Sequence, residues 1–287
     1  MYALIALGYT MVYGIIELIN FAHGDVYTLG SFFSLAILGI IGVSGVVHGP
    51  AAIFIAVGVI VLAALLCGIV GVLIERLAYR RLRNAPRLAP LITAIGVSFI
   101  LENIMQLWKG PTPVSFPQFL PDPHFDLGSV SFDAREIIVV AVSVGFMVLL
   151  QFVIYRTRLG KAMRATAQDR DAAQLMGINV NATIAWTFFI GSALAGVAGF
   201  VSGIYYGSTF FYNGYQAGLK AFTAAVLGGI GNIGGAVLGG FVIGMVETMT
   251  SACISDQWSV VAVFSILVLV LVFRPSGLLG EQLPEKG

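Results

Sequence analysis

The chain has 287 residues, of which 58% are hydrophobic and only 10% are charged. Soluble domains carry roughly 25% charged residues, so this composition and a mean hydropathy of +0.95 exclude a soluble globular domain. The net charge is +1 and the basic residues cluster in loops, without a continuous tract that would bind nucleic acid.

A helix that crosses the ~30 Å hydrocarbon layer of a membrane needs about 20 apolar residues. The chain contains about eight hydrophobic segments near this length. They predict an all-α, polytopic protein with one transmembrane domain over residues 1–287, in close contact with membrane lipid. The segments are Tyr2–Ile16, Val26–Val46, Ala51–Ile74, Pro90–Trp108, Ile137–Tyr155, Ala182–Tyr206, Leu219–Met249 and Ser259–Phe273.

Polar residues interrupt the apolar sequence after the first segment, at Glu17, Asn20, His23 and Asp25. Such groups at membrane depth usually face the interior of a helix bundle, water or a membrane boundary. Interrupted segments in matching places of two halves are also typical of transporter pathways. Two interpretations remain open: a break inside the bundle, or a cytoplasmic turn between the first two helices with His23 as a helix cap.

Loop charges predict the orientation, because Lys and Arg accumulate on the cytoplasmic side. Residues 75–89 carry five arginines, including Arg87, and residues 156–183 carry four arginines and one lysine. Residues 109–136 carry five prolines and only two basic residues, which indicates an ordered outer loop with little helix. The two basic loops are therefore predicted to be cytoplasmic.

The long polar stretch between apolar runs is residues 155–180. It is predicted to form a short amphipathic helix, with Gly160 permitting a turn before it and Gly177 as its C-cap. Four apolar positions fall within about 100° of arc on a helical projection. They are Ala165, Ala172, Leu175 and Met176. A basic loop that only fixes topology and a docking helix for a cytoplasmic partner are both open interpretations.

The glycine-rich part of Leu219–Met249 predicts a second irregular helix. Each interior Gly costs a helix about 1 kcal/mol relative to Ala, so we expect a break or re-entrant turn at Gly228–Gly235. The C-terminal tail after Arg274 carries Lys286 and is expected on the cytoplasmic side. Three full spans after residue 183 would place it outside, so a break in one of them fits the expected position of the tail. Glycines four residues apart in the preceding segment predict close helix packing. They are Gly199, Gly203 and Gly207.

Catalytic motifs are absent from the sequence. The histidines and the two cysteines are scattered, with Cys67 and Cys253 in apolar runs. The glycine-rich run lacks the GK[ST] ending of a phosphate-binding loop. We therefore expect no catalytic residues, no metal site and no ATP hydrolysis by this chain. Glu247 is one of the further polar groups at membrane depth.

Three stretches together resemble the branched-chain amino-acid ABC transporter permeases, specifically the LivH-type subunit. They are Ala6–Phe32, Arg156–Val180 and Gly218–Gly240, supported by the RPSGLLG sequence at Arg274–Gly280. The resemblance implies a multi-pass importer subunit for branched-chain, hydrophobic amino acids in the bacterial cytoplasmic (inner) membrane. It also implies alternating access driven by partner proteins.

The implied partners are a second related permease subunit, two cytoplasmic ATPase subunits that bind Mg-ATP, and a periplasmic or extracytoplasmic substrate-binding protein. This chain itself would hold no cofactor. By the resemblance, Lys161–Gly177 matches the coupling helix that fits a cleft on an ATPase, and three of its charged residues are expected to form ion pairs at the rim of that cleft. These are Arg164, Asp169 and Arg170. The carried-over positions are Gly160, Lys161, Arg164, Ala167, Asp169, Arg170, Ala172, Ala173 and Gly177.

The translocation pathway is expected beside the two interrupted segments. Its candidate residues are Asn20, His23, Gly24, Gly228, Gly229, Gly231 and Asn232. Three alternatives remain open for the function. They are a urea or short-chain amide permease of the same family, an ion-coupled secondary transporter, and a passive channel. The sequence does not settle whether the second permease subunit is another copy of this chain.

Overall fold

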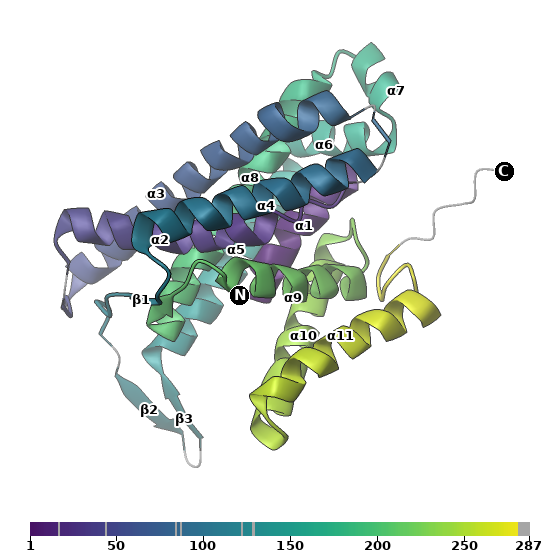
Figure 1. Ribbon diagram of the computed structural model, residues 1–287. Helices are drawn as coiled ribbons and strands as arrows, with labels where there is room; N and C mark the ends of the chain where they lie inside the picture. The colour runs from purple at the N-terminus through teal and green to yellow at the C-terminus, as the bar shows by residue number, and fades with distance from the viewer. Residues whose placement is uncertain are drawn as a thin grey trace.

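The computed structural model describes residues 1–16, 18–43, 45–83, 85–86, 88–121, 123–127 and 130–280. The predictions that involve Glu17, Arg87 and Lys286 lie outside these residues. Helices make up most of the described chain, and a small hairpin projects from one end of the helix bundle (Figure 1).

Within the described residues, seven helices are long and apolar enough to cross a membrane, which confirms the prediction of an all-α, polytopic protein. A shorter apolar helix, α1 (Tyr2–Ile16), precedes them. The seven are α2 (His23–Ile41), α3 (Pro50–Ile74), α4 (Leu88–Lys109), α5 (Ala134–Arg156), α8 (Val180–Tyr206), α10 (Ile233–Cys253) and α11 (Asp256–Phe273). A π-helical turn (Glu75–Tyr79) and a 3-10 turn (Arg80–Leu82) extend α3.

The glycine-rich segment is divided into α9 (Asn213–Gly228) and α10, which confirms the predicted break. Gly229 and Gly231 in the connecting turn have φ angles of 100° and 96°, a left-handed conformation that favours glycine. The Asn232 side chain then caps α10 by accepting a hydrogen bond from the Gly235 backbone nitrogen at 2.9 Å. A Cβ atom on Gly228 would lie 2.0 Å from the Gly235 carbonyl oxygen, so the two helices also pack through their glycines.

The position of the C-terminal tail follows from this extra reversal. The Leu278 backbone nitrogen donates to the Leu227 carbonyl oxygen at 2.8 Å, which attaches the tail to the end of α9. Gly231, in the same turn, approaches Gly14 near the C-terminal end of α1, and α1 in turn contacts the helix that follows α5. The described part of the tail, residues 274–280, therefore lies on the same side of the bundle as residues 156–183, as expected.

The segment between α1 and α2 enters the bundle. The His23 ring lies 4.9 Å from the Tyr9 ring, halfway along α1, and a Cβ atom on Gly8 would lie 2.1 Å from His23 Nε2. Helix α2 thus begins beside the middle of α1, and residues 18–22 run back along α1 to reach it. The interpretation as a cytoplasmic turn capped by His23 is wrong, because Ala22 occupies the N-cap position without a side-chain hydrogen bond and His23 is buried.

Helix α8 forms the centre of the bundle and contacts α1, α2 and α3. A Cβ atom on Gly199 would lie 2.2 Å from the Tyr27 carbonyl oxygen, and one on Gly203 would meet the Phe116 ring at 2.4 Å. Gly199 therefore confirms the predicted close helix packing, whereas Gly203 packs against the loop between α4 and α5 and not against a helix. Gly207 instead ends α8 in a left-handed conformation with φ of 67°, so the packing prediction is wrong there.

The described residues of the proline-rich loop between α4 and α5 contain no helix, as expected, and lie at the end of the bundle away from the α5–α8 connection (Figure 1). It contributes β1 (Val114–Ser115), which pairs antiparallel with β4 (Ser208–Thr209), and the hairpin of β2 (His124–Leu127) and β3 (Val130–Asp133). Buried Phe119 packs against Phe200 of α8 with ring centroids 6.5 Å apart, which anchors the loop on the bundle.

Candidate functional site

Two short helices, α6 (Arg158–Gln168) and α7 (Arg170–Leu175), connect α5 to α8. Between them Asp169 is extended, with φ of −156° and ψ of 114°, and its Oδ1 atom accepts from the Asp171 and Ala172 backbone nitrogens, both at 2.9 Å. Asp169 therefore ends one helix and caps the next, so the prediction of a single amphipathic helix is wrong. Gly177 follows α7 with φ of 82°, as its predicted role at the C-terminal end requires.

The interruption at Asp169 also changes which side chains face the bundle. The buried residues of α6 and α7 include Met163, Thr166 and Ala173. Leu175 and Met176, which belonged to the predicted apolar face, are 88% and 83% exposed. A projection continued through residues 165–176 fails because the backbone changes direction within it.

Gly160 does not form a turn before the helix. It lies inside α6 and is buried. A Cβ atom at this position would lie 2.1 Å from the Ile154 carbonyl oxygen. The glycine is therefore required for the close approach of α6 to the end of α5, and Thr157 provides the cap by accepting from the Gly160 backbone nitrogen at 3.1 Å.

Most of the nine positions expected in the coupling helix lie on the surface. Arg170 is half-buried, and Gly160 and Ala173 are buried. The exposed positions are Lys161, Arg164, Ala167, Asp169, Ala172 and Gly177.

The charged residues expected at a partner's rim are engaged within the chain. The Arg164 guanidinium donates to the Ile154 carbonyl oxygen and lies 5.4 Å from the Tyr155 ring. Arg170 Nη2 donates to the Ile15 carbonyl oxygen at 3.0 Å, and Asp169 caps α7. Two of these residues thus attach α6 to α5 and α7 to the C-terminal end of α1.

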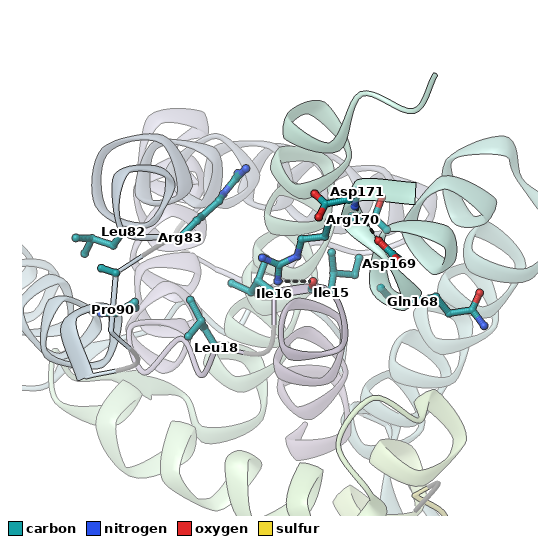
Figure 2. A pocket seen from close by; sticks show the side chains of 13 residues that line it. Ile15, Ile16, Leu18, Leu82, Arg83, Pro90, Gln168, Asp169, Arg170 and Asp171 are labelled. Atoms are coloured by element: carbon teal, nitrogen blue, oxygen red, sulfur yellow. Dashed lines mark hydrogen bonds between the residues drawn. The ribbon is translucent and has the colours of Figure 1, made fainter. Parts of the chain in front are cut away.

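A cavity of about 460 Å³ lies between the end of α1, the loop before α4 and the α6–α7 junction (Figure 2). Figure 2 shows Leu82 and Arg83 on one side of it and Asp169, Arg170 and Asp171 on the other. The cavity is lined by Ile15, Ile16, Leu18, Leu82, Arg83, Ala85, Pro90 and residues 166–171.

An ion pair between Glu75 and Arg83 lies within the first basic loop and holds Arg83 where it contacts the second. The Glu75 side chain is only 1% exposed and that of Arg83 is 14% exposed. Arg83 Nη1 also donates to Asn181 Oδ1 in the first turn of α8 at 2.6 Å. Sequence reasoning missed this role because it assigned all arginines of residues 75–89 to topology. Glu75, the single acidic residue in that loop, is the signal that could have revealed it.

The predicted pathway residues form two separate groups. Asn20, His23 and Gly24 are buried at the start of α2, where a Cβ atom on Gly24 would lie 2.3 Å from the Gly214 carbonyl oxygen. The second group occupies the opposite end of α9, from buried Gly228 and Gly229 to exposed Gly231 and half-buried Asn232. The 14 residues from Gly214 to Gly228 span about 21 Å of helix, so the structure does not unite the two groups, and their part in translocation stays a prediction.

Sequence reasoning also missed the contact between Lys220 of α9 and Glu247 of α10. Lys220 Nζ lies 2.5 Å from Glu247 Oε1, across 27 positions of the chain. Two single charges so far apart in an apolar sequence carry no local signal of pairing.

Comparison with known proteins identifies the family. Residues 1–273 match the family described as branched-chain amino acid transport system / permease component. The chain is 44% identical to the high-affinity branched-chain amino acid transport system permease protein LivH of Escherichia coli K12, over 99% of this chain and 93% of that protein. It is 45% identical to the corresponding permease protein BraD of Pseudomonas aeruginosa, with the same coverage. No solved structure matches the chain. The chain therefore belongs to the family of permease components of branched-chain amino acid transport systems.

Proposed function

We propose that this chain is the membrane-spanning subunit of an ATP-driven importer of branched-chain amino acids in the bacterial cytoplasmic membrane. Family membership and the similarity to LivH and BraD support the substrate class. The observation that carries the coupling to ATPases is the surface of α7, where Leu175 and Met176 are almost fully exposed beside the polar residues of α6 and α7.

Exposed apolar side chains have different meanings in the two parts of this protein. Along the spanning helices they face lipid, whereas α6 and α7 are rich in charged and polar residues and contain no span. Apolar groups exposed on such a surface favour contact with another protein. The partner is a cytoplasmic ATPase that binds Mg-ATP, and this chain holds no cofactor of its own.

The contacts of α6 and α7 support transmission of force into the bundle. Arg164 attaches α6 to the end of α5, and Arg170 attaches α7 to the end of α1. Closure of two ATPase subunits would therefore displace both α5 and α1 and change which side of the membrane has access to the pathway. A second related permease subunit completes the pathway, and an extracytoplasmic binding protein delivers the substrate.

Capture of the ATPase from detergent solution tests the coupling surface. Ala172→Arg combined with Leu175→Arg places two charges on exposed positions of α7. Ala173 is left unchanged because it is buried and its substitution would disturb the fold. The variant should lose the ATPase while it keeps its yield and melting temperature. Val46→Arg with His48→Arg, on exposed positions between α2 and α3, is the matched control and should retain it. Equal capture by both variants would remove α7 from the coupling role.

Uptake by the reconstituted complex tests the activity. The chain, a second permease subunit, the ATPases and the binding protein are placed in liposomes, and uptake of leucine is measured with and without ATP after ion gradients have been collapsed. ATP-dependent leucine uptake supports the proposal. Uptake of urea or acetamide in place of leucine would favour the amide permease, and uptake by this chain alone on an ion gradient would favour a secondary transporter.

A further inference from the structure

A second cavity, of about 350 Å³, lies between α1, α2, α8, α9 and α10. Its walls include Tyr206 at the end of α8 and Ser208 of β4, which pairs with the proline-rich loop. The cavity is therefore at the end of the bundle away from α6 and α7, where an extracytoplasmic binding protein would release its ligand. Its volume is at the lower end of the range of about 300–1,000 Å³ that is typical of small-molecule sites.

The cavity contains one positive and one negative group. Lys220 and Glu247, whose side chains are 12% and 21% exposed, line it and form an ion pair with each other at 2.5 Å. An ammonium group has three donors and a carboxylate has two oxygens with several lone pairs. The pair uses one of the three donors of Lys220, and the Glu247 carboxylate has lone pairs in addition to those that face Lys220 and the Tyr2 hydroxyl, so both groups retain hydrogen-bonding capacity for a ligand. The Tyr2 hydroxyl faces Glu247 from α1.

The charge balance of this cavity selects among ligands. A simple anion would be attracted by Lys220 and repelled by Glu247. A simple cation would be attracted by Glu247 and repelled by Lys220. A zwitterion satisfies both groups at once, because its carboxylate can accept from Lys220 while its ammonium donates to the Glu247 carboxylate. The four charges then alternate in sign. The apolar part of such a ligand would contact Ala217 and the tyrosine rings of the wall.

We propose that this cavity is a transit site for the zwitterionic head group of an amino acid. The inference rests on the proposed function and specifies where the chain would recognise the substrate. Because Lys220 and Glu247 already partly neutralise each other's charge, binding of the ligand is weak, which suits a site that has to release its substrate inward.

Leucine uptake by the full complex in liposomes, with its ATPases and binding protein, tests the site. Lys220→Met combined with Glu247→Gln removes both charges and leaves no unpaired one. We expect leucine uptake to fall at least about tenfold, the factor given by the loss of one charged hydrogen bond in the bound state. Lys109→Met with Glu136→Gln makes the same chemical changes at the outer ends of α4 and α5, and should retain uptake. Complex yield and melting temperature report on folding.

A second variant keeps the test decisive if the double variant does not assemble. Ala217→Leu reduces the cavity volume without altering either charge, and should also lower leucine uptake. Ala141→Leu on the exposed surface of α5 is its control. Uptake at the wild-type rate by either assembled cavity variant would overturn the site and leave Lys220–Glu247 as a structural bridge. Absence of ATP-dependent uptake by the wild-type complex would instead refute the proposed function, and the site with it.

Discussion

The Glu75–Arg83 ion pair offers a direct test of how Arg83 is held where the first basic loop contacts α8. Arg83→Met removes the guanidinium but keeps much of the side-chain volume. It leaves the Glu75 carboxylate, whose side chain is 1% exposed, without its partner, and also removes the donor to Asn181. Removal of one partner of a buried pair costs about 3–5 kcal/mol. Because the Arg83 side chain is 14% exposed, we expect a value near 3 kcal/mol at the lower end of that range.

The assay is thermal unfolding of the purified chain in detergent. A loss of 1 kcal/mol lowers the melting temperature of a 150–250-residue domain by roughly 2–4 °C, so Arg83→Met should lower it by roughly 6–12 °C. Adding Glu75→Gln removes the uncompensated charge and should restore most of the loss. Arg81→Met, at an exposed position of the same loop, is the control and should change the melting temperature by less than about 2 °C.

Two results would refute this reasoning. If Arg83→Met unfolds at the temperature of the Arg81→Met control, Glu75 is not an unsolvated charge that depends on Arg83. If the double variant is less stable than Arg83→Met alone, the two side chains contribute independently, and Glu75 and Arg83 are not an ion pair in the thermodynamic sense.

Three further predictions concern packing, coupling and topology. Gly199→Ala places a Cβ atom 2.2 Å from a carbonyl oxygen of α2 and should lower the free energy of unfolding by about 1–3 kcal/mol. The control Gly145→Ala, in open space on α5, should be neutral or stabilising. Equal melting temperatures of the two variants would contradict the close packing of α8 on α2. Arg170→Met removes the hydrogen bond between α7 and α1. In the reconstituted complex it should lower the ratio of leucine uptake to ATP hydrolysis. An unchanged ratio would exclude coupling through the contact between α7 and α1. Cys253 ends α10, which starts at the cytoplasmic turn after α9, so it is expected on the outer side. In intact cells a membrane-impermeant maleimide should label exposed Cys253 and leave buried Cys67 unlabelled. Labelling of Cys253 only after lysis would contradict the chain reversal at the end of α9.

Breaks in the helices were predictable from the sequence where the helix propensity and capping preference of local residues determine them. Gly228 to Gly235 cannot continue a helix at low cost, and Asn232 is a favourable N-cap, so the α9–α10 turn follows from local propensity. The second break was missed although its signal is similar. Asp169 precedes a helix-forming run and is a strong N-cap residue, but a continuous projection through residues 165–176 concealed it.

Contacts between distant segments could not be predicted in the same way. Lys220 and Glu247 are paired only because α9 and α10 are antiparallel in this packing, and Gly24 is buried only because α9 begins beside it. The proposed coupling surface shows a similar limit. The resemblance to the family predicts which segment meets a partner, but the contacts of Arg164 and Arg170 with the bundle depend on where α5 and α1 end.

Helix α1 connects the two sites that carry the proposals. Its last turn accepts a hydrogen bond from Arg170 of α7 through the Ile15 carbonyl oxygen, and Tyr2 at its other end lines the Lys220–Glu247 cavity. The 13 residues between Tyr2 and Ile15 span about 20 Å of helix, and along this length α1 contacts α8, α9 and α10 (Figure 1). Because a helix is stiff along its axis, a displacement of α7 by an ATPase would move Tyr2 relative to Glu247 and alter the affinity of the cavity. A ligand responds to such a switch only if its affinity differs between the two conformations. A zwitterion held between groups on α9 and α10 meets that condition, because α1 forms the third wall of its cavity and would move.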